Sequence, residues 1–299
     1  MARTRYASDS GLTRRMAGTM GGLLLLYVAV AVVLIIVGVN AIVVVVIAAG
    51  LLWGQWFFSD SMALAAMRAH VVTAEQAPQL HGIVDRLCAL ADMPKPRVAI
   101  ADSDVPNAFA TGRSPHRSVV CVTTGLLRRL DRDELEGVLS HELSHVAHRD
   151  VTVMTVASFA AVLAGLLART AMWGGLGGNR RDNNAAVVAL VVILVSAVVY
   201  IVSFVLTRAL SRYRELAADR GGALLTGNPS ALARALQKVS GDMAQIPNRD
   251  LRSMEPVSAF AFIPALSGKG MDLAHLFATH PPLERRLANL ARISTELGR

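Results

Sequence analysis

The chain has 299 residues, of which 53% are hydrophobic and only 17% are charged. This composition is too apolar for an ordinary water-soluble protein of this length, and it indicates a chain that leaves part of its surface in lipid. The formal charge is +8, but the arginines gather at the borders of apolar stretches instead of forming one basic stripe. We therefore expect contacts with anionic lipid headgroups and no nucleic-acid partner.

Two apolar runs, Met20–Val39 and Ala41–Phe58, follow the N-terminal tail. Each is close to the length of about 20 helical residues that crosses a bilayer core. No charge lies between them around Asn40, so residues 1–58 are predicted to form a tail and a tight transmembrane hairpin. A cleaved signal peptide is the alternative for the first run, but no small-residue cleavage site ends it and a second apolar run follows at once.

A more polar stretch, residues 59–150, follows this hairpin. Two β-branched runs, Pro96–Ala101 and Ser118–Thr123, flank a loop rich in Pro, Asn and Gly, and they are predicted to form an antiparallel pair. Cys88 and Cys121 lie far apart and outside any CxxC pattern, so we expect both to be buried small side chains without disulfide or metal chemistry.

A helix is predicted to begin after Asp131, which is a suitable N-cap residue with Glu134 at the capping-box position. Its apolar residues recur at helical spacing and predict one core-facing stripe, made of Leu135, Leu139, Leu143 and Val146.

This helix carries the stretch VLSHELSHVAHRD, in which His141 and His145 are four residues apart. On a helix such residues project from one face, about 6 Å apart, so that their imidazoles can bind one ion. Glu142 lies about 100° round the helix, beside the ion, where a base acting on metal-bound water belongs. The pattern predicts one Zn²⁺ per chain and hydrolysis of a polarised carbonyl, although such short motifs also recur by chance.

His148 lies about 10 Å along the helix axis from His141, too far to share one ion with it on an unbroken helix. We expect it to be an interfacial surface residue rather than a ligand.

Two further apolar runs, Val151–Trp173 and Ala185–Thr207, predict a second hairpin over residues 151–207. Basic residues before and after the runs would all lie on one side of the membrane, which should be the cytoplasm. Arg169 inside the third run, and Arg180 and Arg181 in the outer loop, leave the depth of this hairpin open.

A catalytic zinc needs a third protein ligand, and the stretch RELAAD after the fourth run contains Glu215 and Asp219 on one helix face. Glu215 could bind the ion while Asp219 accepts the outer N–H of a ligand histidine. An arginine-paired surface helix is the alternative. A hairpin between His145 and Glu215 returns the chain to the same membrane surface, whereas a single crossing would separate the ligands.

Taken together, these stretches resemble the HtpX-type heat-shock zinc proteases of bacterial membranes, which are relatives of the CAAX prenyl proteases. The resemblance covers most of the chain and rests on several stretches in order: PNAFATG, VTTGLL, LSHELSHVAHRD, SRYRELAADRGGALLTGNP and LFATHPPLERRLANL. It implies a multi-pass protein of the bacterial cell membrane. Its catalytic domain would face the cytoplasm and hydrolyse misfolded or damaged membrane proteins.

The resemblance also implies roles for particular residues. His141, His145 and Glu215 would be the zinc ligands and Glu142 the base, in agreement with the motif. Asn107 would lie at the substrate-binding edge, or it is a turn former after Pro106. His280, before two prolines, would stabilise the oxyanion of the transition state, or it is a structural histidine.

The sequence as a whole predicts a mainly α membrane protein. Two transmembrane helical hairpins would carry a cytoplasmic zincin-like α+β catalytic domain, divided between residues 59–150 and 208–299. A non-enzymatic membrane scaffold is the alternative function. An intramembrane protease fits poorly because charged residues precede the motif on its own helix, and a transporter fits poorly because the runs contain almost no charge.

Overall fold

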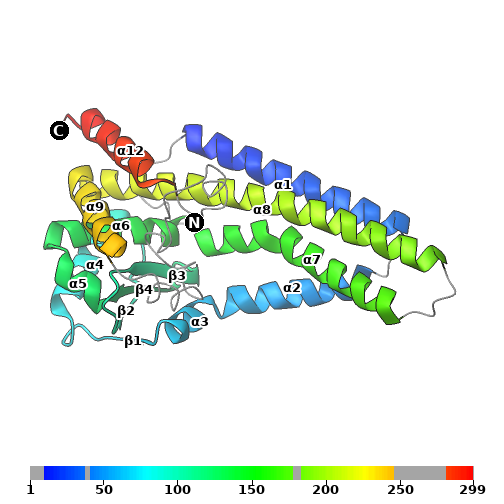
Figure 1. Cartoon of the computed structure of the whole chain (residues 1–299). Helices are drawn as coiled ribbons and strands as arrows, with labels where there is room; N and C mark the ends of the chain where they lie inside the picture. Colours follow the sequence, from blue (N-terminus) through cyan, green and yellow to red (C-terminus); the bar gives the residue numbers. More distant parts are fainter. Residues whose placement is uncertain (1–9, 38–40, 178–182, 246–280, 299) are drawn as a thin grey trace.

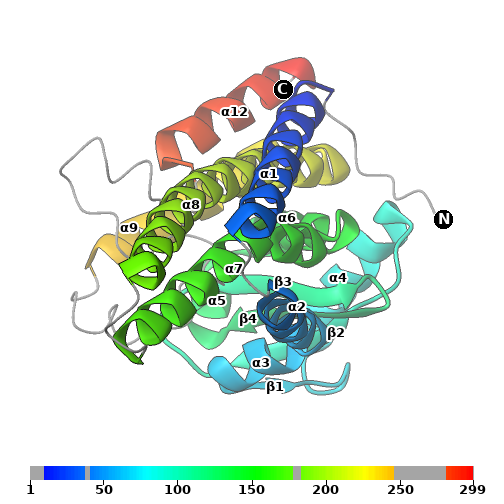
Figure 2. The ribbon, with the colours of Figure 1, turned by 90° about the vertical axis from the view of Figure 1, so that its right-hand side faces the viewer.

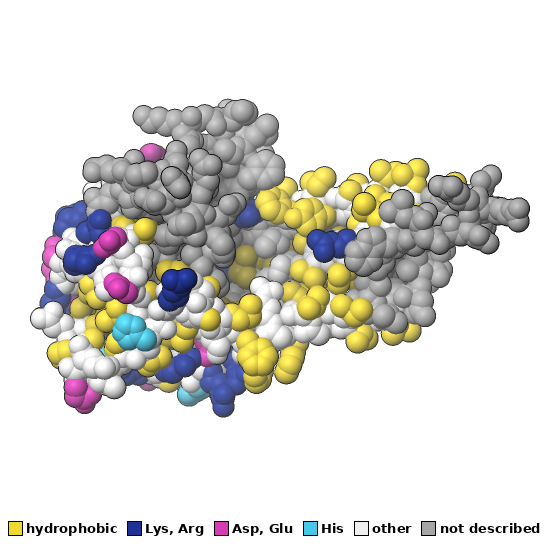
Figure 3. Space-filling model, turned by 60° about the horizontal axis from the view of Figure 1, so that its bottom comes forward, with side chains coloured by type: hydrophobic (Ala, Val, Ile, Leu, Met, Phe, Trp, Pro, Cys, Tyr) yellow, Lys and Arg dark blue, Asp and Glu magenta, His cyan; other side chains and the backbone are white. Residues whose placement is uncertain are grey.

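The computed structural model describes residues 10–37, 41–177, 183–245 and 281–298. A long bundle of apolar helices projects from a rounded part that holds the sheet and the shorter helices (Figure 1). Hydrophobic side chains cover much of the bundle, and charged side chains gather on the rounded part (Figure 3). The apolar and polar stretches of the sequence therefore occupy different regions of the molecule.

Four helices form the bundle: α1 (Ser10–Val37), α2 (Ala41–Phe57), α7 (Asp150–Gly177) and α8 (Asn183–Thr226). The helices α7 and α8 pack against each other, and segments of both, Asp150–Arg169 and Ala189–Thr226, are long and apolar enough to cross a membrane. The described apolar segments of α1 and α2, Met16–Val28 and Val45–Phe57, are shorter.

The first two helices do not form the tight hairpin that the sequence predicted. Viewed along the bundle, α1 lies on α8 and α2 lies on α7, so the described parts of α1 and α2 are splayed apart (Figure 2). Side-chain contacts fix this arrangement: Trp56 on α2 donates to Thr152 on α7 at 2.9 Å, and Leu206 on α8 lies against Gly22 on α1. The second pair of helices separates the first pair because it offers each helix an apolar surface.

The rounded part contains a four-stranded sheet in the order β1-β2-β4-β3. Its strands are β1 (Ala69–Val71), β2 (Arg97–Ala101), β3 (Ala108–Ser114) and β4 (Arg117–Thr123). The predicted antiparallel pairing of the two β-branched runs is wrong, because β2 and β4 are parallel. The loop expected between them contains β3, which forms an antiparallel hairpin with β4 and so reverses the direction in which β4 meets β2.

Short helices pack around the sheet: α3 (Ser59–Ala66), α4 (Pro78–Ala91), α5 (Thr124–Arg129), α6 (Arg132–Ala147), α9 (Pro229–Gln245) and α12 (Leu283–Glu296). One apolar core joins the sheet to α4, α6, α9 and α12 through residues such as Leu87, Val120, Leu139, Leu236 and Leu290. Both cysteines are free and buried, as predicted, and burial raises the pKa of Cys88 to about 11 and that of Cys121 to about 12.

The helix α6 begins as the sequence predicts. The Asp131 carboxylate accepts from the Glu134 backbone at 2.9 Å, and the Glu134 carboxylate accepts from the Asp131 backbone at 3.1 Å, which completes the capping box. The predicted apolar stripe of α6 is buried in the core. The other face of the helix is therefore held toward β3 and α8.

The crossing of α6 and α8 depends on Gly222. A Cβ atom at this position would lie 2.9 Å from the backbone nitrogen of His141, closer than side chains approach. The Ser140 hydroxyl donates to the Gly222 carbonyl at 3.2 Å across the same contact. The two helix backbones can thus approach closely, which places the residues before Gly222 on α8 beside the histidines of α6.

Candidate metal centre

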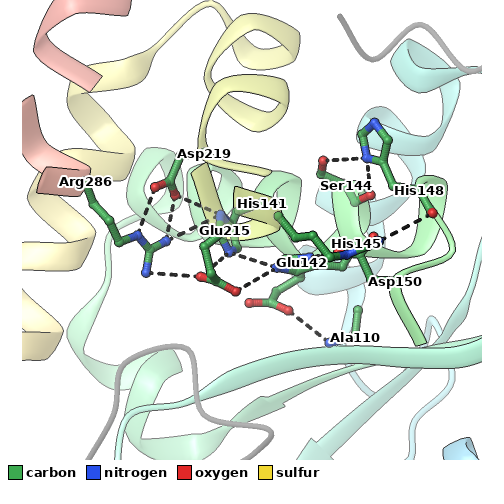
Figure 4. Close-up of polar contacts among 11 residues, drawn as sticks. Ala110, His141, Glu142, Ser144, His145, His148, Asp150, Glu215, Asp219 and Arg286 are labelled. Atoms are coloured by element: carbon green, nitrogen blue, oxygen red, sulfur yellow. Dashed lines mark hydrogen bonds and ion pairs between the residues drawn. The ribbon is translucent and has the colours of Figure 1, made fainter. Parts of the chain in front are cut away.

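Polar side chains from α6, α7, α8 and α12 come together at one place, beside the backbone of β3 (Figure 4). His141 and His145 extend from α6 on the same side, and their rings meet edge to face with centroids 4.8 Å apart. Their Nε2 atoms are 3.2 Å apart. The four-residue spacing therefore produces the converging imidazole pair that the sequence predicted.

Glu215 on α8 completes a group of three possible ligands with these histidines. Its Oε1 lies 3.4 Å from Nε2 of His145, and its Oε2 lies 3.6 Å from Nε2 of His141. Four ligands at about 2.0–2.1 Å from a tetrahedral ion lie about 3.3 Å from one another. The spacing of the three donor atoms, and their two-nitrogen, one-oxygen chemistry, fit a zinc ion with one position left for water or substrate.

Each imidazole presents its other nitrogen to an aspartate. Nδ1 of His141 lies 2.9 Å from Asp219, a contact that the sequence anticipated. Nδ1 of His145 lies 2.6 Å from Asp150, the first residue of α7, which the sequence did not single out. When each aspartate accepts the Nδ1–H of a neutral histidine, the Nε2 atom of that ring, which faces Glu215, is free to bind an ion.

Both aspartates are paired with buried arginines that sequence reasoning missed. The guanidinium of Arg286 on α12 makes two bonds to Asp219, at 2.9 and 2.6 Å, and lies 3.6 Å from Glu215. Arg214 on α8 forms an ion pair with Asp150. Both side chains are almost fully buried.

One signal could have identified Arg286 in the sequence. It lies four and seven residues before Leu290 and Ile293, on the face of α12 that is buried in the core. A charged side chain on the apolar face of an amphipathic helix needs a buried partner of opposite charge. The two carboxylates of α8 that face α12 provide it.

Glu142 lies next to the histidines but is not among the three possible ligands. Its Oε2 accepts the backbone N–H of Ala110 on β3, at 3.0 Å. Burial in the site raises the pKa of Glu142 to about 8, and the nearby Glu215 carboxylate acts in the same direction. A carboxyl group with this pKa can take up and release a proton near neutral pH.

The pKa values of the two histidines are shifted in opposite directions. Burial lowers the pKa of His141 to about 4, although the Asp219 carboxylate opposes the shift. Burial also acts against the charged form of His145, but bonding to Glu215 and the charge of Glu142 outweigh it and raise the pKa of His145. Neutral His141 is therefore ready to bind a cation at neutral pH.

The remaining predicted site residues lie elsewhere or outside the described part of the chain. Asn107 is buried just before β3, where its backbone is bonded to Thr123, at 2.9 Å in each direction. His148 is exposed beyond the end of α6, as expected, and the group of possible ligands consists of His141, His145 and Glu215. His280 lies outside the described residues. Two prolines follow it, and α12 begins at Leu283.

Comparison with known proteins adds independent information. Residues 74–294 match peptidase family M48. The chain is 59% identical to "Protease HtpX homolog 1" of Streptomyces coelicolor, a match that covers 99% of this chain and 97% of the relative. It is 52% identical to "Protease HtpX homolog" of Moorella thermoacetica, over 99% of this chain and 98% of the relative.

A third relative, "Protease HtpX homolog 2" of Methanosarcina acetivorans, is 47% identical over 98% of this chain and 99% of the relative. Among solved structures, that of S. mikatae Ste24p covers 89% of this chain and 66% of its own, with 16% identity and a TM-score of 0.48. The family match spans most of the chain, including the group of possible ligands, and the relatives match at nearly full length. The chain belongs to peptidase family M48 and is a membrane metalloprotease.

Proposed function

We propose that the protein is a membrane-anchored zinc endopeptidase in which His141, His145 and Glu215 bind the ion. The observation that carries this proposal is the convergence of three donor atoms, all within 4.8 Å of one another, from two helices far apart in the sequence. Asp219 would orient His141 from its outer nitrogen. This donor set matches the two histidines and one carboxylate of many catalytic zinc sites.

We infer that Glu142 is the general base. When bound, zinc would polarise the scissile carbonyl and lower the pKa of water toward neutrality. Glu142 would take a proton from the attacking water and then transfer it to the amine nitrogen that leaves. The N–H of Ala110 fixes one carboxylate oxygen of Glu142, so the side chain is held in position before substrate arrives.

We infer further that an extended substrate adds to the β3 edge of the sheet. β3 is the last strand in the order β1-β2-β4-β3, and it lies beside the helix that carries Glu142 (Figure 4). A peptide bonded to an open strand edge is held in an extended form, with its carbonyl groups in a regular array. Asn107 would lie at one end of this edge. A role for His280 in stabilising the oxyanion stays a prediction.

We propose that the substrates are misfolded or damaged membrane proteins, cleaved at the cytoplasmic face. The HtpX-type resemblance supports this substrate class, and the arginines that flank the apolar runs support the orientation. The proposal includes two pairs of membrane helices, a splayed pair in residues 1–58 and the α7–α8 hairpin in residues 151–207, and a catalytic domain divided between residues 59–150 and 208–299. The continuous helix α8 would then carry the chain from the bilayer into the site.

The decisive test is Glu142→Gln, assayed for zinc content and for cleavage of casein as an unfolded polypeptide. We expect about one zinc per chain in both proteins. Cleavage should fall by roughly 10²- to 10⁴-fold, because the amide cannot accept the proton. A zinc chelator should abolish cleavage by the parent enzyme, including any self-cleavage during purification.

The matched control is Glu136→Gln, which changes another buried carboxylate on α6 that is paired with Arg86. This variant should keep both zinc and cleavage. Full cleavage by zinc-loaded Glu142→Gln would exclude Glu142 as the base.

A further inference from the structure

We propose that Asp150 and Arg214 are positioning residues for His145. Asp150 is the first residue of α7 and Arg214 lies on α8, so the two residues connect this proposed ligand to both helices, or arms, of the α7–α8 hairpin. The inference rests on the proposed function in one respect, namely that His145 binds the ion. It adds two residues and a structural link to that site.

The first support is the contact between Asp150 and the imidazole. Oδ2 of Asp150 lies 2.6 Å from Nδ1 of His145, within the range of a charge-assisted hydrogen bond. A carboxylate can only accept in this bond, so the proton of the neutral ring is held on Nδ1 and Nε2 remains an acceptor. Asp150 thus sets both the tautomer and the rotation of the ring.

The second support is the position of Arg214. Its side chain is 4% exposed, it pairs with Asp150, and its Nη2 lies 3.5 Å from the carbonyl of His148. A buried guanidinium is costly without a carboxylate, and a buried carboxylate is costly without a cation. The ion pair therefore fixes the Asp150 carboxylate in place, and through it Arg214 helps to position the imidazole of His145.

The short connection between α6 and α7 brings Asp150 close to His145. Only His148 and Arg149 separate the two helices, and Arg149 has φ +56°, in the left-handed region that side chains other than glycine seldom adopt. This sharp break ends α6 two residues after His145 and turns the chain so that Asp150, the first residue of α7, lies beside the imidazole.

The two histidines are supported from different places. His141 is held by Asp219 and Arg286, which come from α8 and α12 in the rounded part of the molecule. His145 is held by Asp150 and Arg214, where the two arms of the membrane hairpin meet the site. Any change that separates these arms removes the support of His145 first. By thermodynamic linkage, binding of the ion to His145 stabilises the junction of the arms.

The test measures zinc affinity in detergent without substrate, by competition with a chromogenic chelator, for the full-length chain. Asp150→Asn keeps the size of the side chain and removes its charge, and we expect zinc affinity to fall roughly 10- to 100-fold. Asp150→Glu, which restores the charge, should regain part of this loss. The absorption spectrum of the cobalt-substituted protein should change in Asp150→Asn, because it reports the ligand geometry.

A double variant that combines Asp150→Asn with Arg214→Gln tests whether Arg214 acts through Asp150. We expect Arg214→Gln to weaken zinc binding, and the double variant to bind zinc no more weakly than Asp150→Asn alone. The matched control is Arg86→Gln, which removes another arginine–carboxylate pair at α6, 3.0 Å long. This control should bind zinc as the parent does.

Unchanged zinc affinity and an unchanged cobalt spectrum in Asp150→Asn would overturn the inference. Additive losses in the double variant would overturn the part assigned to Arg214. Neither result depends on cleavage. Failure of the proposed base would appear instead as an active Glu142→Gln enzyme, so the two failures are distinguishable.

Discussion

The two halves of α8 show how one continuous helix serves two environments. In its first half, Leu194, Val198 and Ile201 are each about 60% exposed, and the described residues before Thr207 include no charge. In its second half, Leu210 is fully buried and the buried residues include Arg214, Glu215 and Asp219. Apolar side chains face outward in the half that is long and apolar enough to cross a membrane, and charged side chains face inward where the neighbours can pair with them.

The comparison shows that the second half can bury charge because other helices supply the opposite charges. Arg214 meets the carboxylate at the start of α7, and Asp219 meets a guanidinium from α12. The first half packs against apolar residues such as Ala160, Leu163 and Leu167 of α7. The polar site therefore begins where α8 leaves the bundle and α6 and α12 become its neighbours.

The largest effect that we expect concerns the buried carboxyl group of Glu142 in the metal-free protein. Its pKa is raised from 4.5 to about 8 on folding, so the folded state binds a proton that the unfolded state releases. The stability of the metal-free protein should therefore decrease as the pH rises from about 4.5 to 8.

Removing this group should remove that part of the pH dependence. Metal-free Glu142→Gln should be as stable as the parent near pH 4.5, and more stable near pH 8 by a few kcal/mol, since one pKa unit corresponds to about 1.4 kcal/mol. Thermal unfolding in the presence of a chelator, at several pH values, measures the difference. A constant difference across this range would contradict the prediction.

A smaller effect is expected from a charge in the first half of α8. Val198→Arg places a guanidinium near the middle of the apolar run and should oppose membrane insertion by about 2.5–3.5 kcal/mol. The same change at Val71, which is exposed on the edge strand β1, should alter stability by less than about 0.5 kcal/mol. The fraction of chain that integrates into membranes measures the first effect. Equal integration of both variants would mean that this half of α8 does not face lipid.

Local features of the fold could be predicted because their causes lie within a few residues. The capping box of α6 needs only Asp131 and Glu134, and its buried stripe follows from helical spacing. The direction of β4 relative to β2 could not be predicted, because it depends on β3 in between. The stretch AFATGRS has few β-branched residues and a glycine, so it gave only a weak strand pattern.

The residues of the site also fall into those that local sequence could predict and those that depend on how the helices pack. The histidines and Glu142 follow from spacing on one helix, and Glu215 follows from the need for a third ligand close to them. Asp150 and Arg214 belong to the two arms of the hairpin, and their pairing depends on how α7 meets α8. A single sequence gives no register for that contact. The useful signals would have been an aspartate at the N-terminus of an apolar helix and an arginine next to a proposed ligand, both in places where an unpaired charge is costly.

The smallest effect concerns the contact that brings the second half of α8 to α6. Gly222→Ala would place a methyl group 2.9 Å from the backbone nitrogen of His141, so the helices must move apart and stability should fall by about 1–3 kcal/mol. The control is Gly241→Ala on α9, where no atom lies within 4 Å of the added Cβ and the helix should gain up to about 1 kcal/mol. Thermal unfolding of both variants measures this contrast. Zinc affinity should also fall in Gly222→Ala alone, because the displacement moves Glu215 away from the two imidazoles.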